Sequence, residues 1–270
     1  MTSGIRELLE LARTTATAAG DLIVARRSEG VAVAASKSNV LDIVTEADRE
    51  SERLIREMLA AARPNDGFYG EETGAEAGSS GLTWLVDPID GTVNYLYGIP
   101  TYAVSIAVVE GEPDPSTWRA LAGVVVNPAI DEAFEAAAAS GAYLNGRRLA
   151  VNEATDVSQS LIGTGFAYDV ARRGRQGRAL ASMIERFRDV RRIGAASLDL
   201  CSVAAGRLDG YFEQGLRPWD YAAGALIARE AGARVGGLRG EREGERLVLA
   251  AAPGLFDEIE ALIGEHGVEL

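Results

Sequence analysis

The apolar residues of this chain recur first at helical spacing and then at strand spacing, and this change of period restricts its fold more than any other feature. A stripe at three- and four-residue steps predicts a long opening helix; its members are Ile5, Leu8, Leu9, Ala12, Ala16, Ala19 and Ile23. A second helix is expected to begin at Thr45, because Thr45-Glu-Ala-Asp48 has the hydroxyl-x-x-acid pattern that caps free backbone amides. Its apolar stripe comprises Ala47, Leu54, Ile55, Met58, Leu59 and Ala62.

After these two helices the chain predicts short strands, and its second half mixes strands with further helices. Strands are expected at 67–70, 83–86, 101–109, 121–126, 161–166, 208–212 and 246–251. Helices are expected near 197–205, 218–231 and 255–263, and surface loops at 74–81, 111–116 and 237–245. We find no internal repeat, so the sequence predicts an α/β protein rather than a repeat array.

Length and composition fit one folded unit. The chain has 270 residues, of which 47% are hydrophobic and 25% charged, enough apolar material for a packed core. We expect a single domain over 1–270 with a soft division near 145–152. The sequence has no run of about 18 apolar residues, and its polar start leads into an amphipathic stretch. These features predict no contact with a membrane and a cytoplasmic location.

Charge, histidine and cysteine content exclude several kinds of chemistry. Lysine and arginine number 27 against 40 aspartates and glutamates, a net charge of −13, which disfavours binding to nucleic acid. The single cysteine, Cys201, excludes a disulfide framework within the chain and a thiolate metal cage. The single histidine, His266, lies near the C-terminus and makes a histidine-based triad improbable. Any catalysis is therefore expected to use carboxylates, hydroxyls or a hard metal.

Two acids three residues apart follow an apolar strand, in the segment Asp87-Pro-Ile-Asp90-Gly-Thr92. We expect a turn there in which both carboxylates face one point. Close carboxylates raise each other's pKa, and a divalent cation between them removes that cost. An ordinary turn whose acids cap backbone amides is the alternative for these six residues.

Further acids and hydroxyls stand at the ends of other predicted elements. Glu71 and Glu72 follow a strand, Asp220 opens a helix, and Thr45 and Asp48 open another. Taken singly, each also fits a solvated turn, a favourable first-turn charge or a capping box. Taken together they are oxygen ligands without an available histidine or thiolate, which points to magnesium. The patterns of an EF-hand, a dinucleotide-binding loop and a Walker motif do not occur.

Because it contains these residues, the sequence resembles the inositol monophosphatase family of magnesium-dependent phosphatases, and its bacterial branch in particular. Five segments carry the resemblance, in the order that the family has them. They are Asp42-Ile-Val-Thr45-Glu-Ala-Asp48, Gly70-Glu-Glu72, Asp87-Pro-Ile-Asp90-Gly-Thr92-Val-Asn94, Gly194-Ala-Ala-Ser-Leu-Asp199 and Trp219-Asp220-Tyr-Ala-Ala-Gly224. The resemblance covers nearly the whole chain and implies a layered α-β-α-β-α sandwich, a homodimer, and hydrolysis of a phosphomonoester with two or three Mg²⁺ ions.

The resemblance also assigns roles to individual residues. Glu71, Asp87 and the carbonyl of Ile89 would hold a first metal ion, and Asp87, Asp90 and Asp220 a second.

Backbone amides of Gly91 and Thr92 would bind the phosphate, in keeping with the affinity of helix N-termini for anions. Residues that would orient the attacking water are Thr92, Thr45, Asp48 and Glu71. Residues that would contact the substrate are Glu213, Ala196 and Arg191, although the neighbouring Arg192 could replace Arg191.

The substrate is expected to be a small phosphate ester, with myo-inositol monophosphate first. The alternatives are histidinol phosphate, fructose 1,6-bisphosphate and adenosine 3',5'-bisphosphate. The arginines between 172 and 178 are interpreted as a solvated helix face, with contact to a second phosphate as the alternative. A regulatory, RNA-associated module without turnover is the non-enzymatic alternative. From the net acidity we predict no salt-sensitive RNA binding.

Overall fold

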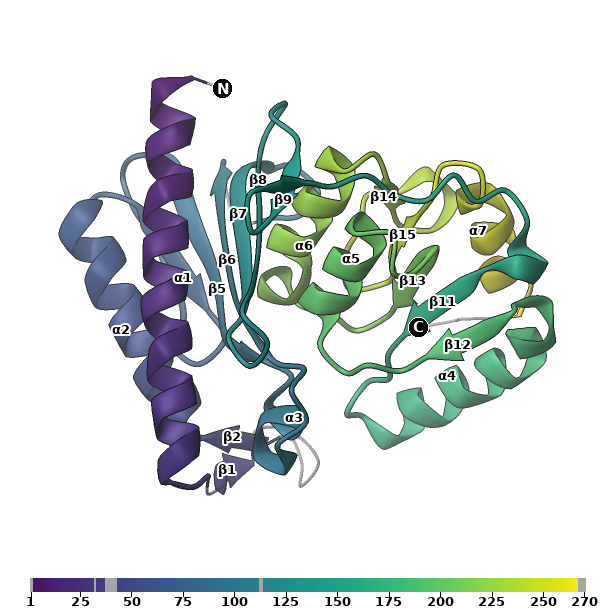
Figure 1. The fold of residues 1–270 in the computed structure, drawn as a ribbon, viewed down its shortest axis with the longest axis horizontal. Coiled ribbons are helices and arrows are strands. Elements are labelled where there is room, and N and C mark those ends of the chain that lie inside the picture. The colour runs from purple at the N-terminus through teal and green to yellow at the C-terminus, as the bar shows by residue number, and fades with distance from the viewer. Residues whose placement is uncertain (1, 32, 37–42, 112–113, 267–270) are drawn as a thin grey trace.

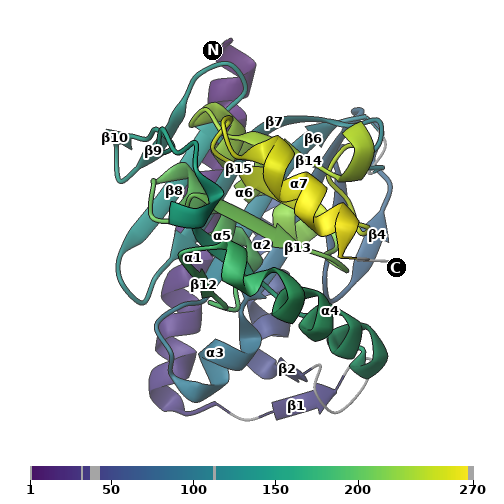
Figure 2. The same cartoon turned by 90° about the vertical axis from the view of Figure 1, so that its right-hand side faces the viewer.

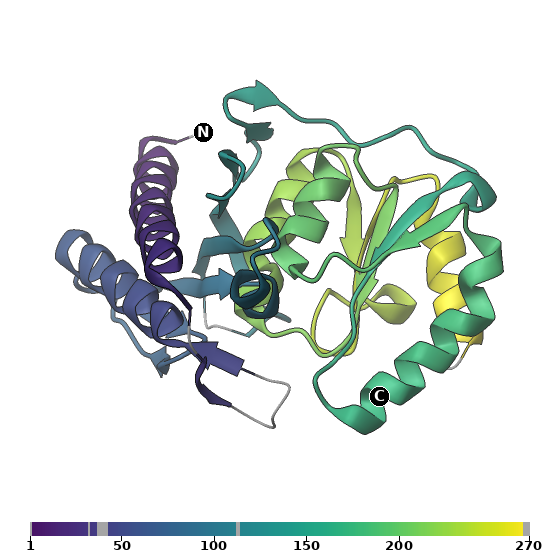
Figure 3. The ribbon, with the colours of Figure 1, turned by 60° about the horizontal axis from the view of Figure 1, so that its bottom comes forward.

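Pairs of helices and two β-sheets alternate in five layers, as Figures 1 and 3 show. The computed structural model of the protein describes residues 2–31, 33–36, 43–111 and 114–266. The layer order is helix pair, eight-stranded sheet, helix pair, five-stranded sheet and helix pair. This confirms the layered α-β-α-β-α sandwich implied by the sequence. Among the described residues, no helix has the length and apolar character needed to cross a bilayer.

The first layer consists of α1 (Ser3–Glu29) and α2 (Glu46–Ala62). The predicted stripe of α1 is confirmed, because Leu8, Ala12, Ala16, Ala19 and Ile23 are buried. These residues form one core with the near face of the first sheet. As predicted, Thr45 is the N-cap of α2 in a capping box. A small two-stranded sheet of β1 (Val33–Ser36) and β2 (Ile43–Thr45) leads into this helix.

The first sheet has the strand order β10-β9-β8-β7-β6-β5-β3-β4. Its strands are β3 (Gly67–Gly70), β4 (Gly74–Glu76), β5 (Leu82–Asp90), β6 (Ala103–Glu110), β7 (Arg119–Asn127), β8 (Glu132–Ala137), β9 (Ala142–Leu144) and β10 (Arg147–Arg148). Two expectations were wrong here. Strand β4 occupies part of the predicted loop at 74–81, and β5 continues through Asp87 to Asp90 instead of ending in a turn. The register of β5 against β6 shifts between Asp87 and Asp90, where Pro88 has no amide to donate.

The middle layer consists of α5 (Ala196–Ala204) and α6 (Pro218–Glu230), close to the predicted bounds. Both helices are covered by sheets on two sides and are rich in small apolar residues. A Cβ atom on Gly224 of α6 would lie 2.8 Å from Leu200 Cβ of α5. On the sheet side, a Cβ on Gly123 of β7 would lie 2.9 Å from the Cα of Ala223. Glycine at both positions therefore allows the middle helices to approach each other and the first sheet closely.

The second sheet and the last helix pair close the sandwich, and Figure 2 looks onto these outer helices. The strand order is β12-β11-β13-β15-β14. The strands are β11 (Leu161–Thr164), β12 (Asp189–Arg191), β13 (Gly210–Glu213), β14 (Arg234–Gly236) and β15 (Val248–Ala251). The outer helices are α4 (Val170–Met183) and α7 (Phe256–Glu265), and a short helix, α3 (Thr92–Tyr97), follows β5. Single 3₁₀ turns lie at Val157–Gln159, Ile184–Arg186 and Leu238–Gly240.

Candidate active site

The carboxylates predicted from the sequence lie where the first sheet meets the start of α6. Strands β3 and β5 run parallel, so Glu71, just after β3, lies at the edge where β5 delivers Asp87. The start of α6 is fixed against the same sheet, because the hydroxyl of Ser105 on β6 donates to the carbonyl of Trp219 over 3.3 Å. The rings of Tyr69 and Trp219 also meet edge to face at 5.0 Å. This packing brings Asp220 to the same corner.

The side chains of Asp87 and Glu71 form a hydrogen bond with each other. Asp87 is only 2% exposed, and burial is the largest cause that raises its pKa well above the usual range. The charge of Glu71 is the next cause, followed by those of Asp90 and Asp220. Two carboxyl groups in contact require either a shared proton or a cation between them. This pair is therefore the strongest electrostatic indication of a cation site.

Asp90 faces the N-terminus of α5. One carboxylate oxygen accepts from the amide of Ala196 at 3.2 Å, and the other accepts from the amide and hydroxyl of Ser197 at 2.7 and 2.5 Å. Burial nevertheless raises the pKa of Asp90, although these bonds and the charge of Arg192 lower it. The next residue, Gly91, has φ +89°, and a Cβ there would lie 3.0 Å from the carbonyl of Thr101. Glycine is thus required where the chain turns from β5 into α3.

Asp220 is the third residue of α6 and accepts the amide of Arg217 at 2.6 Å. The first-turn role that the sequence left open for this acid is therefore present. Burial is the largest cause that raises the pKa of Asp220 well above its usual value, and the charge of Glu71 is the second. Asp220 therefore caps the start of α6 and is also one of the clustered carboxylates.

The chemistry of the four carboxylates fits a hard divalent cation. Across the described ranges, no three acids, histidines or cysteines already stand as a finished ligand set. The hydrogen bonds explain this, because backbone amides hold one oxygen of Asp87, one of Asp220 and both of Asp90. Burial and neighbouring negative charges raise the pKa values of Asp87 and Asp220, and a positive charge would offset the repulsion in such a cluster.

A second network lies beside this cluster. Asp48 is 1% exposed, and one of its oxygens accepts from the amide and hydroxyl of Thr45 at 2.7 and 2.6 Å. Its other oxygen lies 3.2 Å from the hydroxyl of Thr92, which is also 3.1 Å from the carbonyl of Ile89. The predicted capping box and the predicted functional group are thus the same residues. Asp42, part of the same resemblance, lies outside the described residues.

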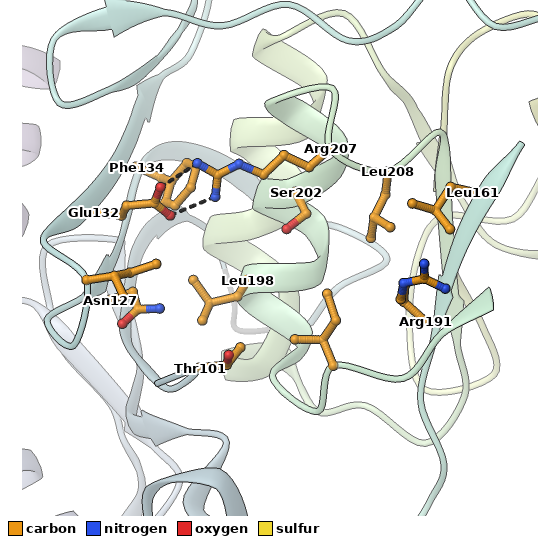
Figure 4. A pocket seen from close by; sticks show the side chains of 12 residues that line it. Thr101, Asn127, Glu132, Phe134, Leu161, Arg191, Leu198, Ser202, Arg207 and Leu208 are labelled. Atoms are coloured by element: carbon orange, nitrogen blue, oxygen red, sulfur yellow. Dashed lines mark hydrogen bonds and ion pairs between the residues drawn. The ribbon is translucent and has the colours of Figure 1, made fainter. Parts of the chain in front are cut away.

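The substrate-contacting residues expected from the resemblance fall into two places. The amide of Ala196 donates to Asp90, and Glu213 lies close enough for burial and, to a smaller extent, the charge of Asp90 to raise its pKa. Arg191 instead pairs with Asp189 at 2.6 Å and lines a separate hollow of about 320 Å³, shown in Figure 4. Arg192 faces the site, because its charge lowers the pKa of both Asp90 and Glu213.

Sequence reasoning missed several residues that support the site. Glu52, which is 1% exposed, accepts the amides of Glu72 and Thr73 at 2.8 and 2.9 Å and so fixes the turn that carries Glu71. Its position four residues after Asp48, on one helix face, was the available signal. The side-chain amide of Asn94 donates to the carbonyls of Thr101 and Ile193 at 2.8 and 3.0 Å and so links α3 to the segments that precede β6 and α5. The sequence alone assigned this residue no role of its own.

The chain is similar to known proteins over most of its length. The model of the "Inositol monophosphatase family" matches residues 5–265. The chain is 46% identical to "Inositol-1-monophosphatase SuhB" of Mycobacterium tuberculosis over 251 residues, covering 89% of this chain and 84% of that protein. It is 39% identical to "Nus factor SuhB" of Haemophilus influenzae over 230 residues, with 84% of each chain covered.

The structure is also similar to a solved structure of this group. The crystal structure of extragenic suppressor protein suhB from Bartonella henselae superposes with a TM-score of 0.87 at 35% identity, covering 95% of this chain and 98% of the other. Sequence and fold therefore lead to the same conclusion: the chain belongs to the inositol monophosphatase family.

Proposed function

We propose that this protein is a magnesium-dependent phosphomonoesterase that hydrolyses a small polyol monophosphate, with myo-inositol monophosphate as the first candidate. The observation that carries the proposal is the hydrogen-bonded carboxyl pair of Asp87, which is buried, and Glu71, which is partly exposed. Such a pair is stabilised by a cation, and a bound cation is what allows a protein of net charge −13 to accept an anionic ester. The names of the inositol-1-monophosphatase relatives support the choice of substrate.

Two or three Mg²⁺ ions are proposed as cofactors. Glu71, Asp87 and the carbonyl of Ile89 would hold one, and Asp87 would share a second with Asp90 and Asp220. Magnesium supplies the positive charge that neutralises the phosphate oxygens and makes water acidic enough to attack phosphorus. Hard carboxylate and carbonyl oxygens are the donors this ion prefers.

The protein groups around the metal site would position the water and the phosphate. The hydroxyl of Thr92 has a single proton, which it shares between Asp48 and the carbonyl of Ile89, so its lone pairs can accept a hydrogen bond from water. Thr45 holds Asp48 in place for this, and Glu71 would contact the same water. The amides of Gly91 and Thr92 would bind phosphate oxygens.

Glu213 and the amide of Ala196 would contact the alcohol portion of the substrate. A carboxylate that accepts from hydroxyl groups favours a polyol over an aromatic or purely anionic leaving group. Arg191 is a weaker candidate because of its ion pair with Asp189, and Arg192 is better placed to contact the substrate.

A panel of phosphate esters tests the function. We expect phosphate release to be fastest from myo-inositol 1-phosphate and slower from histidinol phosphate, fructose 1,6-bisphosphate and adenosine 3',5'-bisphosphate. Chelation with EDTA is expected to abolish release and excess Mg²⁺ to restore it. Full activity in EDTA, or no release from any ester with Mg²⁺, would contradict the proposal.

We also propose that the protein is a cytoplasmic homodimer. The lone cysteine, Cys201, is buried and suits a reducing compartment. Tyr97, Ile99 and Ile130 are large apolar side chains that are 77%, 47% and 50% exposed, and a second subunit would cover them if they lie in the interface. Light scattering should give about twice the chain mass of 28.5 kDa. A mass near that of one chain would reject the dimer.

A regulatory role is the second candidate, because a relative carries the name Nus factor. Two arginines of the basic stretches 172–178 and 186–192 lie near acids: Arg172 is 3.8 Å from Glu245, and Arg186 is 3.8 Å from Glu258. The net charge of −13 further opposes the approach of a polyanion. We therefore expect no RNA binding at physiological salt. Filter-binding titrations at several salt concentrations measure this, and a steep salt slope would favour the regulatory role.

A further inference from the structure

Strand β13 carries a tyrosine and a glutamate on the same face. Tyr211 and Glu213 are two residues apart in the strand, so their side chains lie side by side. The hydroxyl of Tyr211 donates to Oε2 of Glu213 over 2.6 Å. Tyr211 is fully buried, whereas Glu213 keeps part of its surface accessible. The tyrosine therefore holds the glutamate from the interior side.

The neighbouring strand leaves room for this arrangement. Strand β11 runs parallel to β13, with Gly163 opposite Tyr211. A Cβ atom on Gly165 would lie 1.8 Å from Oε2 of Glu213, so any larger residue there would displace the carboxylate. The hydrogen bond from Tyr211 and the backbone of Gly165 together restrict the carboxylate to one position.

This position leaves one oxygen of Glu213 for another donor. Oε2 is occupied by Tyr211, and no hydrogen bond to Oε1 is formed within the described part of the chain. Burial raises the pKa of Glu213 to about 7, while the bond from Tyr211 and the charge of Arg192 favour its ionised form. The remaining carboxyl oxygen can accept a hydrogen bond from a hydroxyl group, so this position favours an alcohol with a free hydroxyl.

We propose that Tyr211 is a positioning residue for substrate selection, whose hydroxyl fixes Glu213 as the acceptor for a free hydroxyl group of the alcohol portion of the ester. This inference rests on the proposed function and adds a residue that determines its substrate class. Esters that lack a free hydroxyl should not depend on Tyr211, because they make no bond to Glu213.

The test compares two esters in the full-length protein with Mg²⁺: myo-inositol 1-phosphate, which has free hydroxyls, and p-nitrophenyl phosphate, which has none. For Tyr211→Phe we expect KM for the inositol ester to rise about tenfold, the order set by one hydrogen bond to a charged group, with kcat unchanged. Both constants for p-nitrophenyl phosphate should stay at the wild-type values. Tyr221→Phe is the matched control, because Tyr221 is equally buried and its hydroxyl has no partner among the described residues.

A double-mutant comparison separates positioning from a general loss of structure. Because Tyr211 acts through Glu213, adding Tyr211→Phe to Glu213→Ala should cause no further rise in KM for the inositol ester. Equal losses on both esters, or additive effects in the double variant, reject the inference. A wild-type protein that cleaves p-nitrophenyl phosphate but no polyol phosphate rejects the proposed substrate class as well. A wild type active on both esters, with an unchanged KM ratio in Tyr211→Phe, rejects the role of Tyr211 alone.

Discussion

At the scale of single residues, Asp90 shows how one carboxylate can serve structure and chemistry together. It accepts three hydrogen bonds from Ala196 and Ser197 and also stands among like charges. Asparagine keeps one acceptor oxygen and removes the negative charge. Because the new amide nitrogen would face a backbone amide that now donates to the carboxylate, we expect Asp90→Asn to unfold cooperatively at a somewhat lower temperature than the wild type. We also expect a loss of turnover of about a hundredfold or more.

The measurement is kcat for inositol 1-phosphate in saturating Mg²⁺, with thermal unfolding followed by circular dichroism. Asp21→Asn, on an exposed position of α1, is the control and should leave both unchanged. Near-normal turnover of Asp90→Asn would show that this carboxylate is not part of the metal site.

Asp66 illustrates a purely structural carboxylate at the same scale. Burial opposes its charge, but hydrogen bonds from Arg63, Ser80 and Trp84 outweigh that cost and lower its pKa. Arg63 donates twice, at 2.9 and 3.1 Å, and the indole of Trp84 donates at 3.0 Å. The side chain thus links the C-terminus of α2 to β5.

A group whose pKa is lower in the folded state stabilises the fold at high pH and loses that effect as the pH falls. We expect Asp66→Asn to lower the free energy of unfolding by about 1–3 kcal/mol at pH 7. The difference from wild type should shrink as the pH falls below about 4, the ordinary aspartate value. Urea unfolding at a series of pH values measures it, and a difference that does not vary with pH would refute this role of the charge.

At the scale of elements, α2 positions the turn after β3 through Glu52. Besides the amides of Glu72 and Thr73, this carboxylate accepts the hydroxyl of Thr73 at 2.6 Å. A Cβ on Gly70 would lie 2.4 Å from Oε2 of Glu52, so the strand end is shaped to admit the carboxylate. The helix thereby sets the position of Glu71 without touching the cation site.

Glutamine at position 52 would place its side-chain NH2 group, a donor, against a backbone amide of Glu72 or Thr73, which is also a donor. We expect Glu52→Gln to raise the Mg²⁺ concentration for half-maximal activity about tenfold, within the range for residues that orient metal ligands. Mg²⁺ titrations of activity measure this. Glu57→Gln, on the exposed side of the same helix, should leave the titration unchanged. An unchanged titration for Glu52→Gln would show that the turn is held by other contacts.

At the scale of the whole molecule, the site depends on how closely the middle helices approach the first sheet. Asp87 comes from β5, while Asp220 and the amides that hold Asp90 come from α6 and α5. Their separation is set by the small residues between the layers, of which Gly123 is one. Stability and cation binding should therefore change together when this spacing changes.

Gly123→Ala tests this coupling. The added Cβ must displace the backbone of α6 at Ala223, so we expect a loss of about 1–3 kcal/mol in the free energy of unfolding and weaker Mg²⁺ activation. Gly177→Ala in α4 has no atom within 4 Å of the added Cβ and should stabilise by about 0.5–1 kcal/mol with unchanged activation. Loss of stability with normal Mg²⁺ activation would show that layer spacing and the site are independent.

The sequence by itself determined the α/β class, most helices and the acids at element ends, because periodicity, capping and turn chemistry act over a few neighbouring residues. The layered sandwich was implied only by the family resemblance. The stripe of α1 and the Thr45–Asp48 capping box are examples. It did not determine that Arg192 rather than Arg191 faces the carboxylates, or that Tyr211 fixes Glu213. Those contacts join residues whose relation depends on strand register and on the packing of layers. Only the tertiary structure decides them, because the direction that each side chain takes depends on the strands and layers packed against it, even where two partners share a strand as Tyr211 and Glu213 do.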